Sequence, residues 1–282
     1  MKKKILFALT ACLVMSLTLL TGCVKVITLA QYSALSEKAL ENTFNHILTT
    51  KNDLSTQQDF KVSKISSEKE YDENGKYEEE RTVKTYSRKG QGENTVFVIR
   101  TEDTTYSWDE ESSSYKTTHT EITIETYAKV NEGYYWLEEH YLSTTMMWTK
   151  YIRQTYSTVD AFKTAVYNQS QNAFKVADDI YADSEVFMIS QISNSEATDE
   201  GEITKLFIDF YSSGLNTSSS ASSLNKQNIC FIYELKDEKL HQMSMHTTIY
   251  SNGVLNSEES ESVSVEYTSQ AAIPTDLDEF GL

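Results

Sequence analysis

The sequence predicts an α+β protein built on one large, curved antiparallel sheet of roughly ten strands, with about three helices over its concave face. Apolar and polar residues alternate in segments such as 118–124 and 262–267, as they do where one face of a strand meets solvent. Asn-Gly pairs at 74–75 and 252–253 are strong hairpin signals. Three amphipathic segments predict the helices that bury the apolar face of the sheet.

The strands are expected in hairpins around those turns and then along the rest of the chain. Asn74-Gly75 joins a strand over about 60–71 to one over about 76–88, and Asn252-Gly253 joins about 240–250 to about 254–268. Because the connections are short, strands adjacent in sequence should be adjacent in the sheet. Further strands are expected at 95–102, 115–127, 134–141, 146–155, 185–193 and 229–235.

The three predicted helices carry apolar residues at helical spacing. The first runs from about 33 to 48, and the second begins at Ser157, with Asp160 three residues on as a capping pair. The third follows Asp199, and a strand is the competing interpretation of that segment. Its apolar residues at i, i+3, i+4 and i+7 are Ile203, Leu206, Phe207 and Phe210.

The first 23 residues have the layout of an export signal. Three lysines at 2–4 precede an apolar run over 5–20, which at 16 residues is shorter than the roughly 20 that a membrane-spanning helix needs. Leu20-Thr21-Gly22-Cys23 resembles the lipobox of bacterial lipoproteins. That resemblance implies a diacylglyceryl thioether on Cys23, cleavage between Gly22 and Cys23, and stable anchoring by two acyl chains. An uncleaved anchor and an ordinary secretory signal are the alternatives.

The charge balance excludes some classes of partner. The formal charge is −17, and loss of the three lysines with residues 1–22 makes it −20. Nucleic-acid binding needs basic surface, so we expect no nucleic-acid partner. An acidic chain would not dock on an anionic leaflet by charge, which leaves the lipid as the membrane attachment. Only Cys230 remains besides Cys23, so no intrachain disulfide is expected.

The mature chain also resembles exported lipoproteins with the half-barrel fold of the LolA/LppX type, as found in many Gram-positive bacteria. The lipobox, a helix after the anchor, a long meander broken by one mid-chain helix, the hairpin at 252–253 and the closing segment 271–274 carry this resemblance. It covers about residues 30–280. It implies a tether over 23–32 and a single domain over 33–282, an open half-barrel whose concave face holds acyl chains or other apolar ligands.

The densest aromatic stretches are candidates for a ligand wall. On strands, about half of these side chains would face the concave side, where apolar pockets are lined. The alternative is plain core between sheet and helices, because every sheet buries one face. The predicted wall consists of Tyr134, Trp136, Met146, Trp148 and Phe207.

We find no sequence motif for catalysis, and we expect no cofactor and no metal. His241, Met243 and Met245 would share one face of a strand and suit Cu(I), but methionine is also a common core residue. No nucleophile or phosphate-loop motif stands in a fitting context. The sequence therefore predicts a membrane-anchored, non-catalytic extracytoplasmic binder of an apolar ligand. The alternative is an interaction or structural envelope lipoprotein with a solid core and no small-molecule ligand.

Overall fold

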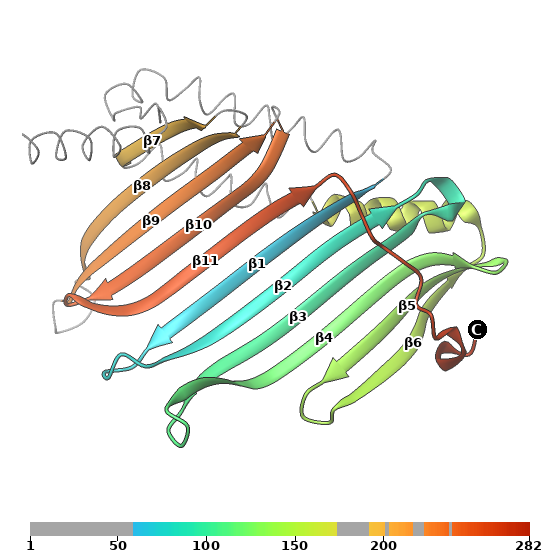
Figure 1. The fold of residues 1–282 in the computed structure, drawn as a ribbon, viewed down its shortest axis with the longest axis horizontal. Helices are drawn as coiled ribbons and strands as arrows, with labels where there is room; N and C mark the ends of the chain where they lie inside the picture. Colours follow the sequence, from blue (N-terminus) through green and yellow to red (C-terminus); the bar gives the residue numbers. More distant parts are fainter. Residues whose placement is uncertain (1–58, 174–191, 201–202, 217–222, 237–238) are drawn as a thin grey trace, which may run out of the picture.

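A computed structural model describes residues 59–173, 192–200, 203–216, 223–236 and 239–282, with side chains described for 59–173 and 241–282. One antiparallel sheet of eleven strands dominates these residues (Figure 1). It is open, with β6 (Met147–Tyr156) at one edge and β7 (Ile192–Glu200) at the other. The predicted large antiparallel sheet is therefore confirmed.

The order of strands is sequential in each half of the sheet, and the halves meet in the middle. β1 (Phe60–Tyr71) lies beside β11 (Val254–Glu266), so the first and last strands are neighbours. From β1 towards β6 the sheet runs through β2 (Tyr77–Lys89), β3 (Val96–Asp109), β4 (Ser114–Val130) and β5 (Gly133–Leu142). From β11 towards β7 it runs through β10 (Lys239–Ser251), β9 (Ser223–Lys236) and β8 (Ile203–Asn216).

The helix predictions need one correction. The segment after Asp199 is strand β8, paired along its length with β9, and not a helix. Its apolar spacing fits either structure, and pairing with β9 decides for the strand. The first predicted helix, over 33–48, lies outside the described residues. The second is present from residue 159 to 173, the only α-helix in the described part of the chain. Thr158, one residue after the predicted cap, accepts a hydrogen bond from the Ala161 amide at 3.2 Å.

Both Asn-Gly hairpins are confirmed, but their turns differ. At Asn252-Gly253 both residues have positive φ, 53° and 84°, as a type I′ turn requires. In the β1–β2 turn only Gly75 does, at 75°. There the Gly75 amide donates to the Asp72 carbonyl at 3.0 Å, and the Asp72 carboxylate accepts from two further amides. The hydrogen bonds to Asp72 stabilise this turn, and Gly75 is its one residue in the left-handed conformation.

The two faces of the sheet are covered by different segments. Strand pairing puts four aromatic side chains on one face of the sheet: Phe60, Phe97, Tyr127 and Trp136. The helix over 159–173 lies on this face (Figure 1). The centre of its Phe162 ring is 5.2 Å from that of the Tyr134 ring. We call this face of the sheet the helix face. Residues 267–282, which we call the strap, cross the opposite face and end in the 3₁₀ turn η2 (Leu277–Phe280). We call that face the strap face.

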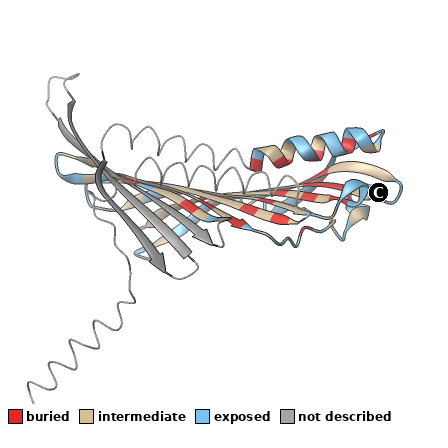
Figure 2. Cartoon of the chain, turned by 90° about the horizontal axis from the view of Figure 1, so that it is seen from above, coloured by how far each residue is buried: buried red, intermediate tan, exposed pale blue. Residues whose placement is uncertain are grey.

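The core lies at the end of the sheet that the helix covers (Figure 2). Four of the largest fully buried side chains belong to the helix and the helix face: Phe60, Phe97, Tyr127 and Phe162. Beyond the helix the same face becomes polar. A groove of about 360 Å³ there is lined chiefly by hydroxyl and carboxylate side chains, among them Ser66, Glu68, Glu80, Thr82, Glu259 and Glu261.

Charge pairs connect the two strands at the centre of the sheet. Lys61 Nζ lies 2.7 Å from the Glu266 carboxylate, and Lys64 Nζ lies 2.8 Å from that of Glu261. The hydroxyl of Tyr71 donates to Glu258 at 2.8 Å. The register of β1 on β11 thus matches basic or hydroxyl groups on one strand with carboxylates on the other. This match stabilises one register over its neighbours.

At residue 68 of β1, carboxylates face one another across both neighbouring strands. Glu68 is directly opposite Glu80 on β2 and Glu259 on β11. Like charges directly opposite one another destabilise a sheet. We expect Glu68→Gln to raise the free energy of unfolding by about 0.3 kcal/mol, because Glu68 is exposed and solvent screens the repulsion. Thermal unfolding followed by circular dichroism measures this change.

Glu266→Gln is the matched control for that variant. It removes a carboxylate that attracts Lys61 instead of one that repels its neighbours, so the melting temperature should fall slightly or stay unchanged. Added salt should narrow the difference between Glu68→Gln and the unmodified chain. A lower melting temperature for Glu68→Gln would contradict the repulsion.

Candidate functional site

The four residues of the predicted ligand wall whose side chains the structure describes lie on both faces of the sheet and in a turn. Tyr134 and Trp136 lie on the helix face of β5. Trp148 lies on the strap face of β6, opposite Tyr141, and its ring is 5.2 Å from that of Tyr141. Met146 is in the β5–β6 turn with its side chain 81% exposed. Phe207 is on β8, and its side chain lies outside the described residues, as do Gly22 and Cys23.

Tyr134 and Trp136 belong to a packed aromatic row. Trp136 stacks on Tyr127 with ring centroids 5.5 Å apart, and Tyr127 contacts Phe97 at 6.1 Å. The row continues to Phe60, and the helix adds Phe162 from above. Rings at these distances fill the space between helix and sheet. For these two residues the contacts favour core over a ligand wall.

Edge strand β6 exposes apolar side chains on both faces of the sheet. The exposed fractions are 63% for Met147, 44% for Trp148, 47% for Tyr151 and 37% for Ile152. Trp148 and Ile152 point to the strap face, whereas Met147 and Tyr151 point to the helix face. An edge strand also has one side whose backbone groups pair with no strand of its own sheet. β6 therefore offers both hydrogen-bonding groups and apolar side chains.

The two cations of β6 are bound to groups of the same molecule. Arg153 makes a two-pronged contact with Glu138, through Nε at 2.7 Å and a terminal nitrogen at 2.8 Å. That contact raises the pKa of Arg153. Sheet edges are commonly protected from unwanted pairing by charged side chains. Here the guanidinium pairs with a carboxylate of the neighbouring strand although its side chain is 52% exposed, and β6 exposes polar residues such as Thr149 and Gln154 beside the apolar ones.

Lys150, the other cation, holds the strap against the sheet. Its side chain is only 8% exposed, and its Nζ contacts Glu139 at 3.6 Å and Glu279 at 2.9 Å, as well as Asp276. The Nζ also lies 5.6 Å from the centre of the buried Phe280 ring. One lysine thus gathers three carboxylates from β5 and the strap, which would repel each other without it.

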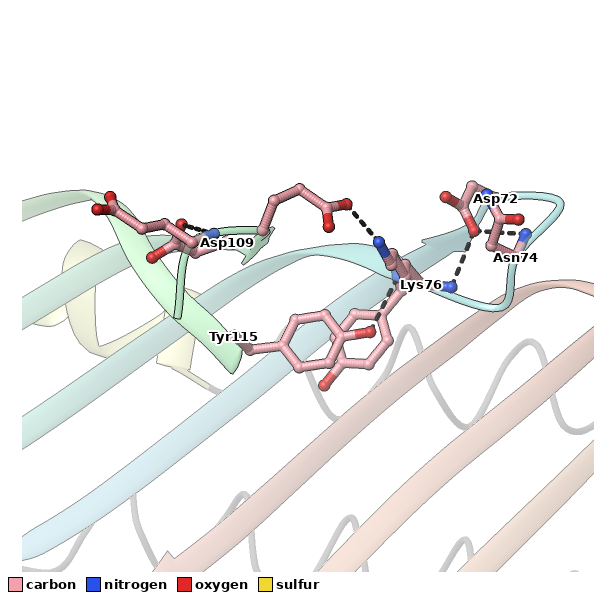
Figure 3. A network of polar contacts seen from close by, with 8 residues as sticks. Asp72, Asn74, Lys76, Asp109 and Tyr115 are labelled. Atoms are coloured by element: carbon pink, nitrogen blue, oxygen red, sulfur yellow. Dashed lines mark hydrogen bonds and ion pairs between the residues drawn. The ribbon is translucent and has the colours of Figure 1, made fainter. Parts of the chain in front are cut away.

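A second polar network lies at the far tips of the β1–β2 and β3–β4 hairpins (Figure 3). The Tyr77 amide donates to the Tyr115 hydroxyl at 3.1 Å, and Lys76 bonds to Glu110. Hydrogen bonds, chiefly from Lys116 and then from Ser112, lower the pKa of Asp109 to about 2. The amides of the β1–β2 turn likewise hold the pKa of Asp72 below its usual range. These carboxylates are occupied in closing turns.

The histidines and carboxylates do not form a metal site in the described part of the chain, where no group of three or more has suitable geometry. Met243 is fully buried and His241 is exposed, so the two are not presented together. Among the described helices, none has the length and apolar character to cross a bilayer. Comparisons with models of protein families, with curated proteins and with solved structures found no match.

Sequence reasoning picked out Trp148 and Met146, which the structure places on the strap face of β6 and in the exposed β5–β6 turn. Density of aromatic and methionine residues indicates apolar surface and does not say whether that surface is covered. The available signal was the composition of 147–156, which has two cations, no carboxylate and five large apolar or aromatic side chains. A strand that is apolar on both faces is typical of burial, yet this one is at an edge.

We predict that Lys150→Met releases the strap while leaving the sheet folded. Loss of the ammonium leaves Glu139, Asp276 and Glu279 to repel one another. Hydrogen exchange followed by mass spectrometry should show faster exchange over 276–280, by about tenfold or more, with little change in β2 and β3.

Lys116→Met is the matched control, because it removes a more exposed lysine that pairs with Asp109 at another hairpin. Exchange in the strap should be the same in this variant as in the unmodified chain. Unchanged exchange over 276–280 in Lys150→Met would show that the strap is held by other contacts.

Proposed function

We propose that the chain is a lipid-anchored, non-catalytic protein outside the cytoplasm that binds another polypeptide along edge strand β6. The partner would add an extended segment to β6, with backbone hydrogen bonds providing affinity and side-chain pockets providing selectivity. Of the hypotheses that the sequence raises, this is closest to an interaction lipoprotein with a solid core.

The location rests on the sequence Leu20-Thr21-Gly22-Cys23 after a short apolar run. A thioether-linked lipid with two acyl chains gives stable attachment, since each buried CH₂ contributes about 0.8 kcal/mol. The kinship with LolA/LppX-type half-barrels is part of the same proposal. An open antiparallel sheet with a helix after its sixth strand supports it.

The observation that supports strand addition most is the exposure of Met147, Trp148, Tyr151 and Ile152 along an edge that no other described strand pairs with. The opposite edge is different in composition. Strand β7 contains three carboxylates, Glu196, Asp199 and Glu200, and its sequence has no large apolar residue after Ile192. Charged edges resist pairing, whereas apolar edges favour it. β6 is thus the edge suited to a partner.

A second candidate is the binding of an apolar or amphiphilic small molecule, the first hypothesis from the sequence. A cavity beside the helix favours it, because Val166 and the ring of Tyr167 form part of its lining. Mass spectrometry of protein extracted from its native membrane would detect a co-purifying lipid. It would also report acylation of Cys23.

Site-specific photo-crosslinking tests the partner surface. A benzoylphenylalanine placed at Met147 or Tyr151 in cells should give a discrete crosslinked product, because both side chains are exposed beside the open edge. Trp148→Ser combined with Ile152→Ser should abolish that product. Gel electrophoresis and mass spectrometry identify the attached chain, and a second copy of this protein is one of the identities they can report.

The same probe at Val254 is the control, since Val254 is 64% exposed but lies in the distant β10–β11 hairpin. Equal products from Val254 and from β6, or none from β6, would contradict the proposal. Cys23→Ser tests the anchor separately. Mass spectrometry should find a diacylglyceryl group on Cys23 of the unmodified chain and none on residue 23 of the variant, and a free Cys23 thiol in membrane-bound protein would refute lipidation.

A further inference from the structure

A cavity of about 260 Å³ lies between the helix and the connection from β2 to β3. Arg88 of its lining stands near the end of β2 (Tyr77–Lys89), and Figure 1 shows the helix at that end of the sheet. Residues of the connection form one wall, and the outer turns of the helix form the other. The lining consists of Arg88, Gly92, Thr95, Lys163, Val166 and Tyr167.

Arg88 brings a positive charge into an apolar row. On β2 it is paired with Phe60 on one side and Phe97 on the other, both fully buried. Its Nε is shielded from solvent and has no hydrogen-bond partner. Burial lowers the pKa of this guanidinium, and the nearby Asp59 only partly offsets that effect. A shielded guanidinium N–H without a hydrogen-bond partner is costly, and an anion bound beside Nε would supply one.

The surroundings add positive charge at the mouth of the cavity. Lys163 extends from the exposed side of the helix into the lining. The carboxylate of Asp59 accepts a hydrogen bond from the Gly90 amide at 2.9 Å. Glu93 accepts from Tyr134 at 2.8 Å and from Lys129 at 3.4 Å. Asp59 and Glu93 are also close enough to interact with Arg88 and Lys163 respectively, but only the two cations belong to the lining of the cavity.

The other side chains that line the cavity are apolar, or their polar group already makes a hydrogen bond within the protein. Val166 is buried, and the Tyr167 ring forms an exposed rim. Thr95 is buried, and its hydroxyl donates to the Gly92 carbonyl at 3.0 Å, which leaves its methyl group as free surface. The backbone of this wall is shaped by Gly90 and Gly92, with φ of 80° and 62°. At Gly90 a Cβ atom would lie 2.9 Å from the Asn94 carbonyl oxygen.

We propose that this cavity binds a small organic anion with an apolar body, its anionic group at Arg88 and Lys163 and its apolar part against Val166 and Tyr167. Arg88 would bind the anion through its Nε and a terminal nitrogen, the two-pronged geometry that carboxylates favour. The volume equals that of about nine water molecules, which suits a ligand of about ten non-hydrogen atoms.

The proposed anion site does not involve β6, so this proposal does not depend on strand addition to β6. It gives chemical content to the second candidate function, because the ligand class is an anionic amphiphile of limited length and not a neutral lipid.

Octanoate and octanamide are matched probes, since they have the same size and differ in charge. Titration of the full chain with each, followed by NMR of a ¹³C-labelled carbonyl carbon, should show one octanoate bound per chain and octanamide at least about tenfold weaker. Arg88→Gln should weaken octanoate by about tenfold or more, and Lys163→Gln by about threefold. Lys163 is exposed, so its variant tests the site even if Arg88→Gln fails to fold.

Lys89→Gln is the control, because Lys89 is exposed and neighbours Arg88 on the opposite face. It should bind octanoate like the unmodified chain. Equal binding of octanoate and octanamide, or full affinity in Lys163→Gln and Arg88→Gln, would overturn the proposal. Inorganic phosphate binding as tightly as octanoate would overturn the role of the apolar wall.

Discussion

The pairing of β1 with β11 is the constraint on which the rest of the structure depends. Residues 61 and 266, 205 positions apart, are partners in the sheet and are linked by an ion pair. Because the cost of closing a loop grows only slowly with its length, such distant pairing is compatible with stability. It joins two meanders into one sheet and sends the middle of the chain, β6 and β7, to the open edges.

That topology explains where the surfaces of the protein lie. The helix that follows β6 folds back over the aromatic row, and Phe162 completes the core there. The strap after β11 crosses the opposite face as far as Lys150. β6 therefore contacts both covering segments through its faces, and within the described sheet its outer edge pairs with no strand. The cavity at Arg88 forms where the helix and the β2–β3 connection meet.

Local signals predicted much of this fold, and non-local pairing explains the rest. The bounds of β1 and both Asn-Gly hairpins follow from alternation and turn chemistry. The apolar spacing of β8 fits a helix as well as a strand, and the strand predicted over 185–193 overlaps only the start of β7, whose later residues show no apolar face. Arg88 could not be singled out, since nothing in the sequence says that a basic residue will stand between two buried phenylalanines.

Disulfide trapping across the centre of the sheet tests this account most directly. Ser63 and Ser264 are direct partners in β1 and β11, so cysteines at both positions, in a Cys230→Ser background, should crosslink rapidly under mild oxidation. Cysteines at Ser63 and Ser260 should not, because Ser260 is opposite Ser67. Crosslinking of the second pair, or of neither pair in folded protein, would contradict the single sheet and with it the placement of β6 at an open edge.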